Sequence, residues 1–381
     1  FEINNMLFDL FISFFYINII AYFLLLFWFI IGILKTKSSS SNISLNIIKD
    51  VSVIICAKNE ENILNNILND LKNQNYKGNI EFIIVDDNSS DNTSSIIYDY
   101  IDKDKRFKYT HSDEGDSSLS HKKRALDAGI KISQYDYLMF TDAGCRLNKD
   151  WAKSMINQYR DDKDYIIGLS FAKDVKKLVS KFQKIDLFML MISTLSSANL
   201  NYPLASTGQN LSYKKDIFLS MNGFSRISNL MMGDDSIFMQ MCLKSNSIRL
   251  GISNESNSFV DSKIIYNWRD LLVQRIRWGG DGIIMWKYNK CFFIIMLVTF
   301  LANLFYIMIP FIFYSSIHFL IILFLIKFSI ELTFYLIGSI KVNRKIYIID
   351  FISWFFIQIP YIVLVGLLSP FAYYLGWKSN S

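Results

Sequence analysis

VSVIICAKNEE, residues 51 to 61, opens as a run of mostly β-branched apolar side chains and ends in a polar, acidic segment. Two later stretches follow the same order, IEFIIVDDNSSDNT at residues 80 to 93 and YDYLMFTDAGC at residues 135 to 145. Apolar runs of this length are typical of strands buried on both faces of a parallel sheet. Ligands of open parallel sheets bind at the carboxyl ends of the strands, so the acidic segments are candidate site residues.

Segments with helical periodicity separate these apolar runs. Residues 60 to 74, EENILNNILNDLKNQ, carry apolar side chains from Ile63 to Leu71 at the spacing of one helix face. A segment rich in Lys and Ala precedes the third run and is expected to be helical. The alternation of strand and helix predicts an α/β fold, a Rossmann-like and mostly parallel sheet with helices on both faces.

The first part of the chain contains a long uncharged segment. Leu10 to Leu34 holds no charged residue and is long enough to cross a bilayer. Lys35 and Lys37 follow it, whereas Glu2 and Asp9 precede it. Because cytoplasmic flanks carry the excess of Lys and Arg, the chain after Leu34 is predicted to lie in the cytoplasm.

The end of the chain is predicted to cross the membrane three times. Residues 291 to 326 hold no charge and are too many for one span, so with the residues up to 340 they predict two helices that turn near Ser315, Ser316 and His318. A basic loop, KVNRK at residues 341 to 345, and an uncharged run from Phe351 to Trp377 follow. With one span before the domain, this count places KVNRK in the cytoplasm, as its charge requires.

Glu331 is an acidic residue inside one of these predicted spans. An ionisable residue at such a position is a functional candidate. Lys327 precedes it by one helical turn, so a structural ion pair explains it equally well.

These patterns divide the chain into five segments. They are an anchor over residues 1 to 34, a Ser/Asn-rich linker over 35 to 50, a catalytic domain over 51 to 262, an amphipathic interface segment over 263 to 290, and a membrane region over 291 to 381. The prediction is a multi-pass protein of the cytoplasmic (inner) membrane with its domain in the cytoplasm. Basic residues in excess are expected to face anionic membrane lipids.

The composition excludes some classes of function. The net charge of +6 comes from interspersed charges and indicates no nucleic-acid partner. The four cysteines lie far apart, without metal-ligand spacing, and are expected to be reduced thiols. The oligomeric state is left open.

The three acidic segments lack the Gly-rich loop that cradles bare phosphate. They suit a divalent cation that holds a diphosphate, together with carboxylates that bind a base or a ribose. Each segment alone could also serve only as a helix cap.

The order of the motifs gives a specific resemblance. VSVIICAKNEENI, IIVDDNSSDNT, HKKRALDAGI and FTDAGC are followed by STGQNLSYKKDIFLSMNGF (206 to 224), MMGDDSIF (231 to 238) and QRIRW (274 to 278). Together they resemble a membrane-bound family 2 glycosyltransferase with the GT-A fold, over roughly residues 51 to 288.

The resemblance implies roles for residues of the donor site. Glu60 and Asp87 correspond to residues that contact the nucleoside, with Asp86 as a substitute or a support for Asp87. Lys122 corresponds to a lysine that helps to hold the nucleotide. Asp142 corresponds to the first aspartate of a DxD-type motif, which meets the diphosphate and its metal.

The resemblance also implies the catalytic and acceptor residues. Asp235 corresponds to the catalytic base, with Asp234 as its acidic neighbour, although GDDSIF could be only a helix amino-terminus. Gln274, Arg277 and Trp278 correspond to a QxxRW motif near the diphosphate and the acceptor. The same segment could be only an amphipathic helix at the membrane surface.

Two positions depart from the family pattern. Gly144 stands where the DxD-type motif usually has its second carboxylate, and His121 stands where Gly is common. Either Asp142, water and phosphate oxygens hold Mg²⁺ or Mn²⁺, or metal dependence is weak.

The prediction from the sequence is an inverting glycosyltransferase that moves a sugar from a nucleotide-sugar donor to a lipid-linked or saccharide acceptor. A processive polysaccharide synthase and an inactive scaffold of envelope assembly are alternatives, the latter because of Gly144. A transporter with a nucleotide-binding domain would need charges in several spans, and only Glu331 and Lys327 lie well inside one.

Overall fold

The computed structural model describes residues 2–36, 47–173, 176–245, 248–312, 317–345 and 347–375. The chain forms two compact units. The α/β unit comprises Ser38–Asp174 and Leu204–Ile264, and the helical unit comprises Phe1–Lys37, Val175–Pro203 and Ile265–Ser381. Compared with the division predicted from the sequence, Val175–Pro203 fall in the helical unit, and the α/β unit begins at Ser38, inside the predicted linker.

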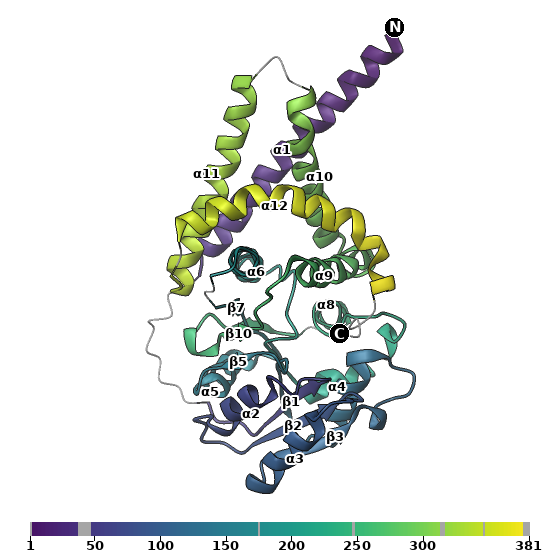
Figure 1. Ribbon diagram of the computed structural model, residues 1–381, viewed down its shortest axis with the longest axis vertical. Helices are drawn as coiled ribbons and strands as arrows, with labels where there is room; N and C mark the ends of the chain where they lie inside the picture. Colours follow the sequence, from purple (N-terminus) through teal and green to yellow (C-terminus); the bar gives the residue numbers. More distant parts are fainter. Residues whose placement is uncertain are drawn as a thin grey trace. The chain divides into compact units, whose positions relative to one another are not determined.

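A seven-stranded sheet forms the centre of the α/β unit (Figure 1). Its first four strands are mutually parallel, and β8 joins them antiparallel to β4. This arrangement confirms the predicted mostly parallel sheet. In spatial order the strands are β3 (Phe107–His111), β2 (Ile80–Asp86), β1 (Val51–Ala57), β4 (Tyr137–Phe140), β8 (Leu211–Lys214), β6 (Tyr165–Ile167) and β9 (Leu250–Ile252).

A second sheet of three short strands brings distant segments of the chain together. It has the order β5 (Arg146–Leu147), β10 (Val260–Ser262) and β7 (Ser170–Ala172). In the antiparallel pair of β10 and β5, Val260 lies opposite Leu147 and Asp261 lies opposite Arg146. The residues that follow β10 are thereby brought near those that precede β5.

Helices pack against the large sheet through their apolar faces. On α2 the predicted face is confirmed, since Leu64, Ile67, Leu68 and Leu71 are buried in one core with alternate residues of β1 and β2. Burial of such a side chain contributes about 1.5–3 kcal/mol. The helices of the unit are α2 (Leu64–Lys72), α3 (Thr93–Lys103), α4 (His121–Ile132), α5 (Trp151–Ile156), α7 (Lys215–Ser220) and α8 (Ser236–Ser245), with short 3₁₀ turns at Ser112–Glu114, Asn157–Asp162, Ser225–Ile227 and Ser256–Ser258.

Gly129 lets α4 approach the sheet closely. A Cβ atom at this position would lie 2.6 Å from Cγ2 of Ile54 and 3.0 Å from Cγ2 of Val85. Real side chains do not tolerate such a distance, so the close packing of α4 requires glycine here. The amino-terminal turn of α4, which carries Lys122 and Lys123, is fixed beside the strand ends as a result.

Among its described residues, the helical unit contains four helices long and apolar enough to cross a membrane, over Asp9–Leu34, Lys290–Phe311, His318–Val342 and Ile348–Tyr374. They confirm the predicted spans; the expected turn at Ser315 and Ser316, the end of the last run at Trp377, and most of the linker lie outside the described residues. The last span bends, with Pro360 inside it (Figure 1). The helices are α1 (Glu2–Leu34), α6 (Leu178–Asn199), α9 (Trp268–Tyr288), α10 (Lys290–Ile312), α11 (Ile317–Val342) and α12 (Ile348–Leu368), followed by a 3₁₀ turn at Ser369–Leu375.

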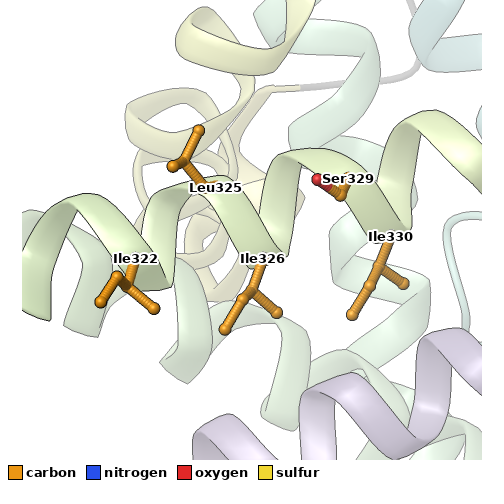
Figure 2. Close-up of a pocket in the computed structure, with 5 residues that line it drawn as sticks. All are labelled: Ile322, Leu325, Ile326, Ser329 and Ile330. Atoms are coloured by element: carbon orange, nitrogen blue, oxygen red, sulfur yellow. The ribbon is translucent and has the colours of Figure 1, made fainter.

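One face of α11 leaves large apolar side chains uncovered. A hollow on this helix is lined by Ile322, Leu325, Ile326, Ser329 and Ile330, which lie three or four residues apart (Figure 2). More than half of the surface of Ile322 and Leu325 is exposed. Soluble monomers rarely expose such a continuous apolar face, whereas lipid tails would cover it.

Candidate active site

The acidic segments after β1 and β2 form one hydrogen-bonded structure. The Asn59 N–H donates to Oγ of Ser89 (3.0 Å), and the Ser90 N–H donates to Oδ1 of Asn59 (2.8 Å). The Glu60 N–H donates to the hydroxyl of Thr93 (2.9 Å), at the start of α3. These bonds hold two loops that are distant in sequence at the same edge of the sheet.

Asp86 and Asp87 have different surroundings although they are neighbours. Asp86 is buried and accepts hydrogen bonds from the Ser89 N–H (3.0 Å) and the Ser94 hydroxyl (2.6 Å). These bonds give Asp86 a structural role, and its predicted donor contact stays a prediction. Asp87 lies 3.7 Å from Nζ of Lys58, and 13% of its side chain is exposed; its predicted contact with the nucleoside also stays a prediction.

Lys122 joins two of the predicted carboxylates. Its Nζ atom donates to Oδ1 of Asp142 (2.7 Å) and lies 3.6 Å from Oδ2 of Asp234. Burial alone would lower the pKa of Lys122, but the charges of Asp142 and Asp234 raise it well above its ordinary value. Lys122 is therefore a protonated, positively charged side chain among the acidic residues.

Asp235 is held by backbone N–H groups. One carboxylate oxygen accepts from Gly208 (3.0 Å), and the other accepts from Ser236. Burial and the charge of Asp234 raise the pKa of Asp235 to about 6, against the lowering effect of these hydrogen bonds and of Lys122. A carboxylate with this pKa can take up a proton near neutral pH.

The loop that carries Gly208 passes close to the charged groups. A Cβ atom at Gly208 would lie 3.0 Å from Nζ of Lys122 and 3.4 Å from Oδ2 of Asp234. The sequence contains Gly208 within STGQN, but its contact with Asp235 joins segments that no periodicity connects. This residue was missed as a member of the site.

Cys56, near the end of β1, is buried within the electrostatic reach of several charged residues of the site. Burial raises the pKa of its thiol, the Lys122 ammonium opposes that change, and the charges of Asp87, Asp234 and Asp142 raise the pKa further. All four charged groups thus lie around one thiol. The charges of Asp87, Asp142 and Asp234 thus act on one thiol, while the predicted meeting of Asp87, Asp142 and Asp235 in a single cleft and the role of each stay predictions.

Lys123, beside Lys122 on α4, was also missed. Its side chain is fully buried, and its Nζ atom donates to the carbonyl oxygens of Leu230 and Met232 (3.3 Å to the latter). Gly233, with φ of +106°, and Asp234 follow directly. The two lysines therefore act together, one on the carboxylates and one on the loop that bears them.

The Lys123→Met variant is expected to unfold with a free energy lower by about 1–3 kcal/mol, because two buried carbonyls lose a charged donor. The activity of the site should fall with it, since the loop before Asp234 is released. Thermal unfolding and kcat measure the two effects. Lys131→Met on the same helix removes an exposed ammonium group from Asp127, which keeps its hydrogen bond from the Asp116 N–H. This variant should lose clearly less stability than Lys123→Met; equal effects of both variants would refute the assignment.

The residues of the QxxRW motif lie on α9 of the helical unit, whereas the carboxylates lie in the α/β unit. Their predicted contact with the diphosphate or acceptor stays a prediction. Arg275, inside the motif, is buried; its Nε donates to Asp186 (2.7 Å), its Nη1 donates to Gln274 (2.8 Å), and its guanidinium stacks 4.1 Å from the Trp278 ring. Arg275 therefore fixes the orientation of Gln274 and Trp278, two of the three predicted motif residues. The third predicted motif residue is Arg277.

A divalent cation would find one accessible carboxylate at this site. Among the described residues, no group of three or more His, Cys, Asp or Glu side chains is arranged to hold a metal ion. The side chain of Asp142 is 37% exposed, and Gly144 supplies no ligand. One carboxylate is enough for Mg²⁺, which commonly keeps waters and takes its other ligands from substrate phosphates.

Comparison with known proteins identifies the fold. The mannosyltransferase PcManGT from Pyrobaculum calidifontis, solved in complex with GDP-Man and Mn²⁺, superposes over 96% of this chain and 95% of that one, with a TM-score of 0.56 and 13% identity. At this identity the likeness shows the fold alone, which is the predicted GT-A fold.

Curated relatives match part of the chain. An uncharacterized glycosyltransferase of Haemophilus influenzae is 34% identical over 109 residues, 28% of this chain and 41% of that protein. The poly-β-1,6-N-acetyl-D-glucosamine synthase of Staphylococcus epidermidis is 28% identical over 141 residues, 36% of this chain and 33% of that protein. The matched regions thus cover less than half the length of these relatives.

Two family models match the chain and together extend over both units. The model described as glycosyl transferase family 2 matches residues 52–218. The model described as glycosyl transferase family group 2 matches residues 137–369, more than half of the chain. The chain therefore belongs to the family 2 glycosyltransferases and is a glycosyltransferase.

Proposed function

We propose that this protein transfers a sugar, with inversion, from a nucleotide-sugar donor to a lipid-linked or saccharide acceptor at the cytoplasmic face of the cell membrane. The observation that carries the proposal is the cluster of Asp142, Asp234 and Asp235 around Lys122, with Asp87 acting on the same Cys56 thiol as Lys122. These residues come from the carboxyl ends of β2 and β4, from the start of α4 and from the loop before α8. This is the edge at which open α/β sheets bind their ligands.

The reaction forms a bond between the acceptor oxygen and the anomeric carbon and breaks the bond from that carbon to the donor diphosphate. Asp235, ionised above its pKa of about 6, accepts the proton of the acceptor hydroxyl. Lys122 lies where its positive charge can stabilise the departing diphosphate. Because the displacement is single, the anomeric centre is inverted.

Asp142 is the residue that would hold Mg²⁺ or Mn²⁺, with water and the donor phosphates as further ligands. When bound, such an ion would supply additional positive charge to the diphosphate. Asp87 and Glu60, at the ends of the neighbouring strands, are proposed to bind the nucleoside. The presence of GDP-Man and Mn²⁺ with PcManGT supports this assignment.

The four apolar helices support a membrane acceptor, because a soluble acceptor would not require them. The basic residues Lys35, Arg344 and Lys345, at the ends of these helices, support a cytoplasmic placement. A processive polysaccharide synthase is the second candidate, supported by the synthase among the relatives. The length of the product, measured by mass spectrometry, separates single addition from polymerisation.

The test uses the full chain purified in detergent, a bacterial lipid extract, and UDP-GlcNAc or GDP-Man as donor. Release of the nucleoside diphosphate and NMR of the product should show transfer with inversion. Asp142→Asn should abolish it, and Asp164→Asn is the matched control, because Asp164 forms a 2.7 Å pair with Lys214 away from the cluster. Absence of donor binding and of transfer across a panel of nucleotide sugars, or retention at the anomeric centre, would contradict the proposal.

A further inference from the structure

Gly144 and Lys263 are neighbours in space, although more than a hundred residues separate them in sequence. The pairing of β10 with β5 brings the residue after β10 next to the residues before β5. A Cβ atom at Gly144 would lie 3.0 Å from Cδ and 3.2 Å from Cβ of Lys263. The aliphatic part of Lys263 therefore fills the space into which a second carboxylate would extend.

The ammonium group of Lys263 points to the donor side of the site. Its Nζ atom lies 3.4 Å from Oε2 of Glu60, and 58% of its side chain is exposed. Glu60 is one of the residues proposed to bind the nucleoside. The charge of Lys263 is thus anchored near the donor site and remains accessible to a ligand.

The backbone beside Lys263 is fixed to the catalytic loop. The hydroxyl of Ser262 donates to Oε1 of Gln209 (3.0 Å), and Gly208 next to it donates its N–H to Asp235. Lys263 therefore follows a strand held to the same loop that positions the catalytic base. The backbone of Lys263 is therefore held in place relative to Asp235.

We propose that Lys263 binds the diphosphate of the donor. It would do so beside Gly144, where the DxD-type motif usually has its second carboxylate. The proposal deepens the proposed function and rests on it. Lys122 pairs with Asp142 and is the first ammonium group of the site. Lys263 adds a second one, in a site with one carboxylate fewer than the DxD-type motif usually provides. A nucleoside diphosphate then finds fixed positive charges from two lysines, and its affinity depends less on a divalent cation.

The direct test measures the binding of UDP and GDP to the full chain in detergent by titration calorimetry, once with EDTA and once with MnCl₂. Lys263→Ala should weaken binding in EDTA by about tenfold or more, as expected for a charge-assisted contact. Lys263→Arg should stay close to the unmodified protein. Unchanged thermal unfolding without nucleotide confirms that the variants are folded.

Lys173→Ala is the matched control. Lys173 is 55% exposed and lies 3.4 Å from Asp261, so its exposure and its ion pair resemble those of Lys263. Its replacement should leave nucleotide affinity unchanged. A loss equal to that of Lys263→Ala would reduce the effect to surface charge and would overturn the proposal.

A second pair of variants tests whether the ammonium group of Lys263 takes the place of a carboxylate at position 144 and its metal ion. Gly144→Asp should weaken binding in EDTA, whereas Gly144→Asp/Lys263→Ala should bind in MnCl₂ at least about tenfold more tightly than in EDTA. If the unmodified protein binds UDP or GDP and Lys263→Ala binds equally well in EDTA, this proposal fails and the proposed function stands. If the unmodified protein binds no nucleotide, the proposed function fails first.

Discussion

The Asp235→Asn variant is expected to transfer sugar about 10²–10⁴-fold more slowly than the unmodified enzyme. Asn keeps the size of the side chain, and its single amide oxygen can still accept the Gly208 N–H bond, whereas the bond from the Ser236 N–H is lost. The Asn side chain cannot take up the proton of the acceptor hydroxyl. The loss should therefore appear in kcat, while the affinity for the nucleotide sugar changes little.

The pH dependence of the unmodified enzyme tests the same assignment. Below a pKa of about 6, Asp235 carries a proton and cannot act as a base, so kcat/KM should rise as the pH passes through this value and then level off. The charge of Asp234 contributes to the raised pKa of Asp235. Asp234→Asn removes that charge and should move the acidic limb of the profile to lower pH.

Asp216→Asn is the control for both experiments, because Asp216 is exposed at the start of α7, away from the catalytic loop. Its rate and its pH profile should match those of the unmodified enzyme. An Asp235→Asn variant with full kcat, or a profile without a limb near pH 6, would remove Asp235 from the role of base.

The acidic residues at the edge of the sheet could be predicted because they follow recognisable strands. The β-branched runs predict β1 and β2, and the acidic residues come directly after them. Parallel strands end at the same edge, so the meeting of Asp87 and Asp142 follows from the order of elements. No tertiary contact had to be known.

The supporting residues could not be predicted in this way. Lys123 looks like a solvated charge on a basic helix, yet it is buried against carbonyls more than a hundred residues later in the chain. Lys263 becomes meaningful only through the pairing of β10 with β5. Gly208 acts through its backbone, which carries no side-chain signal. Each depends on a contact between distant segments, and local periodicity does not predict such contacts.

The spans of the helical unit show the same contrast. Their lengths follow from the absence of charge, and the one-turn spacing of Lys327 and Glu331 predicts an ion pair. The structure contains this pair, with 2.5 Å between Nζ and Oε1 and both side chains almost completely buried. Its partners on other helices could not be predicted. Tyr22 of α1 donates to Oε1 of Glu331 (2.5 Å), and Gln358 of α12 donates to Oε2 (2.9 Å).

Glu331→Leu is expected to lower the free energy of unfolding by about 3–5 kcal/mol, because it leaves Lys327 as a buried charge without its carboxylate. The rings of Phe355 and Tyr306, 4.9 and 5.6 Å from Nζ, do not replace that charge. The double variant Lys327→Met/Glu331→Leu buries no charge and should recover most of the loss. Thermal unfolding in detergent of the single and double variants gives the coupling energy of the pair.

The same variants decide between the structural and the functional explanation of Glu331. Four helices contribute to the network, α1 and α12 through hydrogen bonds to Glu331, α10 through the Tyr306 ring, and α11 through the pair itself. If the network serves to fix their packing, the double variant should be stable and should transfer sugar at close to the normal rate. A double variant that is stable but inactive would instead give the pair a part in the reaction, and a Glu331→Leu variant as stable as the unmodified protein would show that the carboxylate compensates no buried charge.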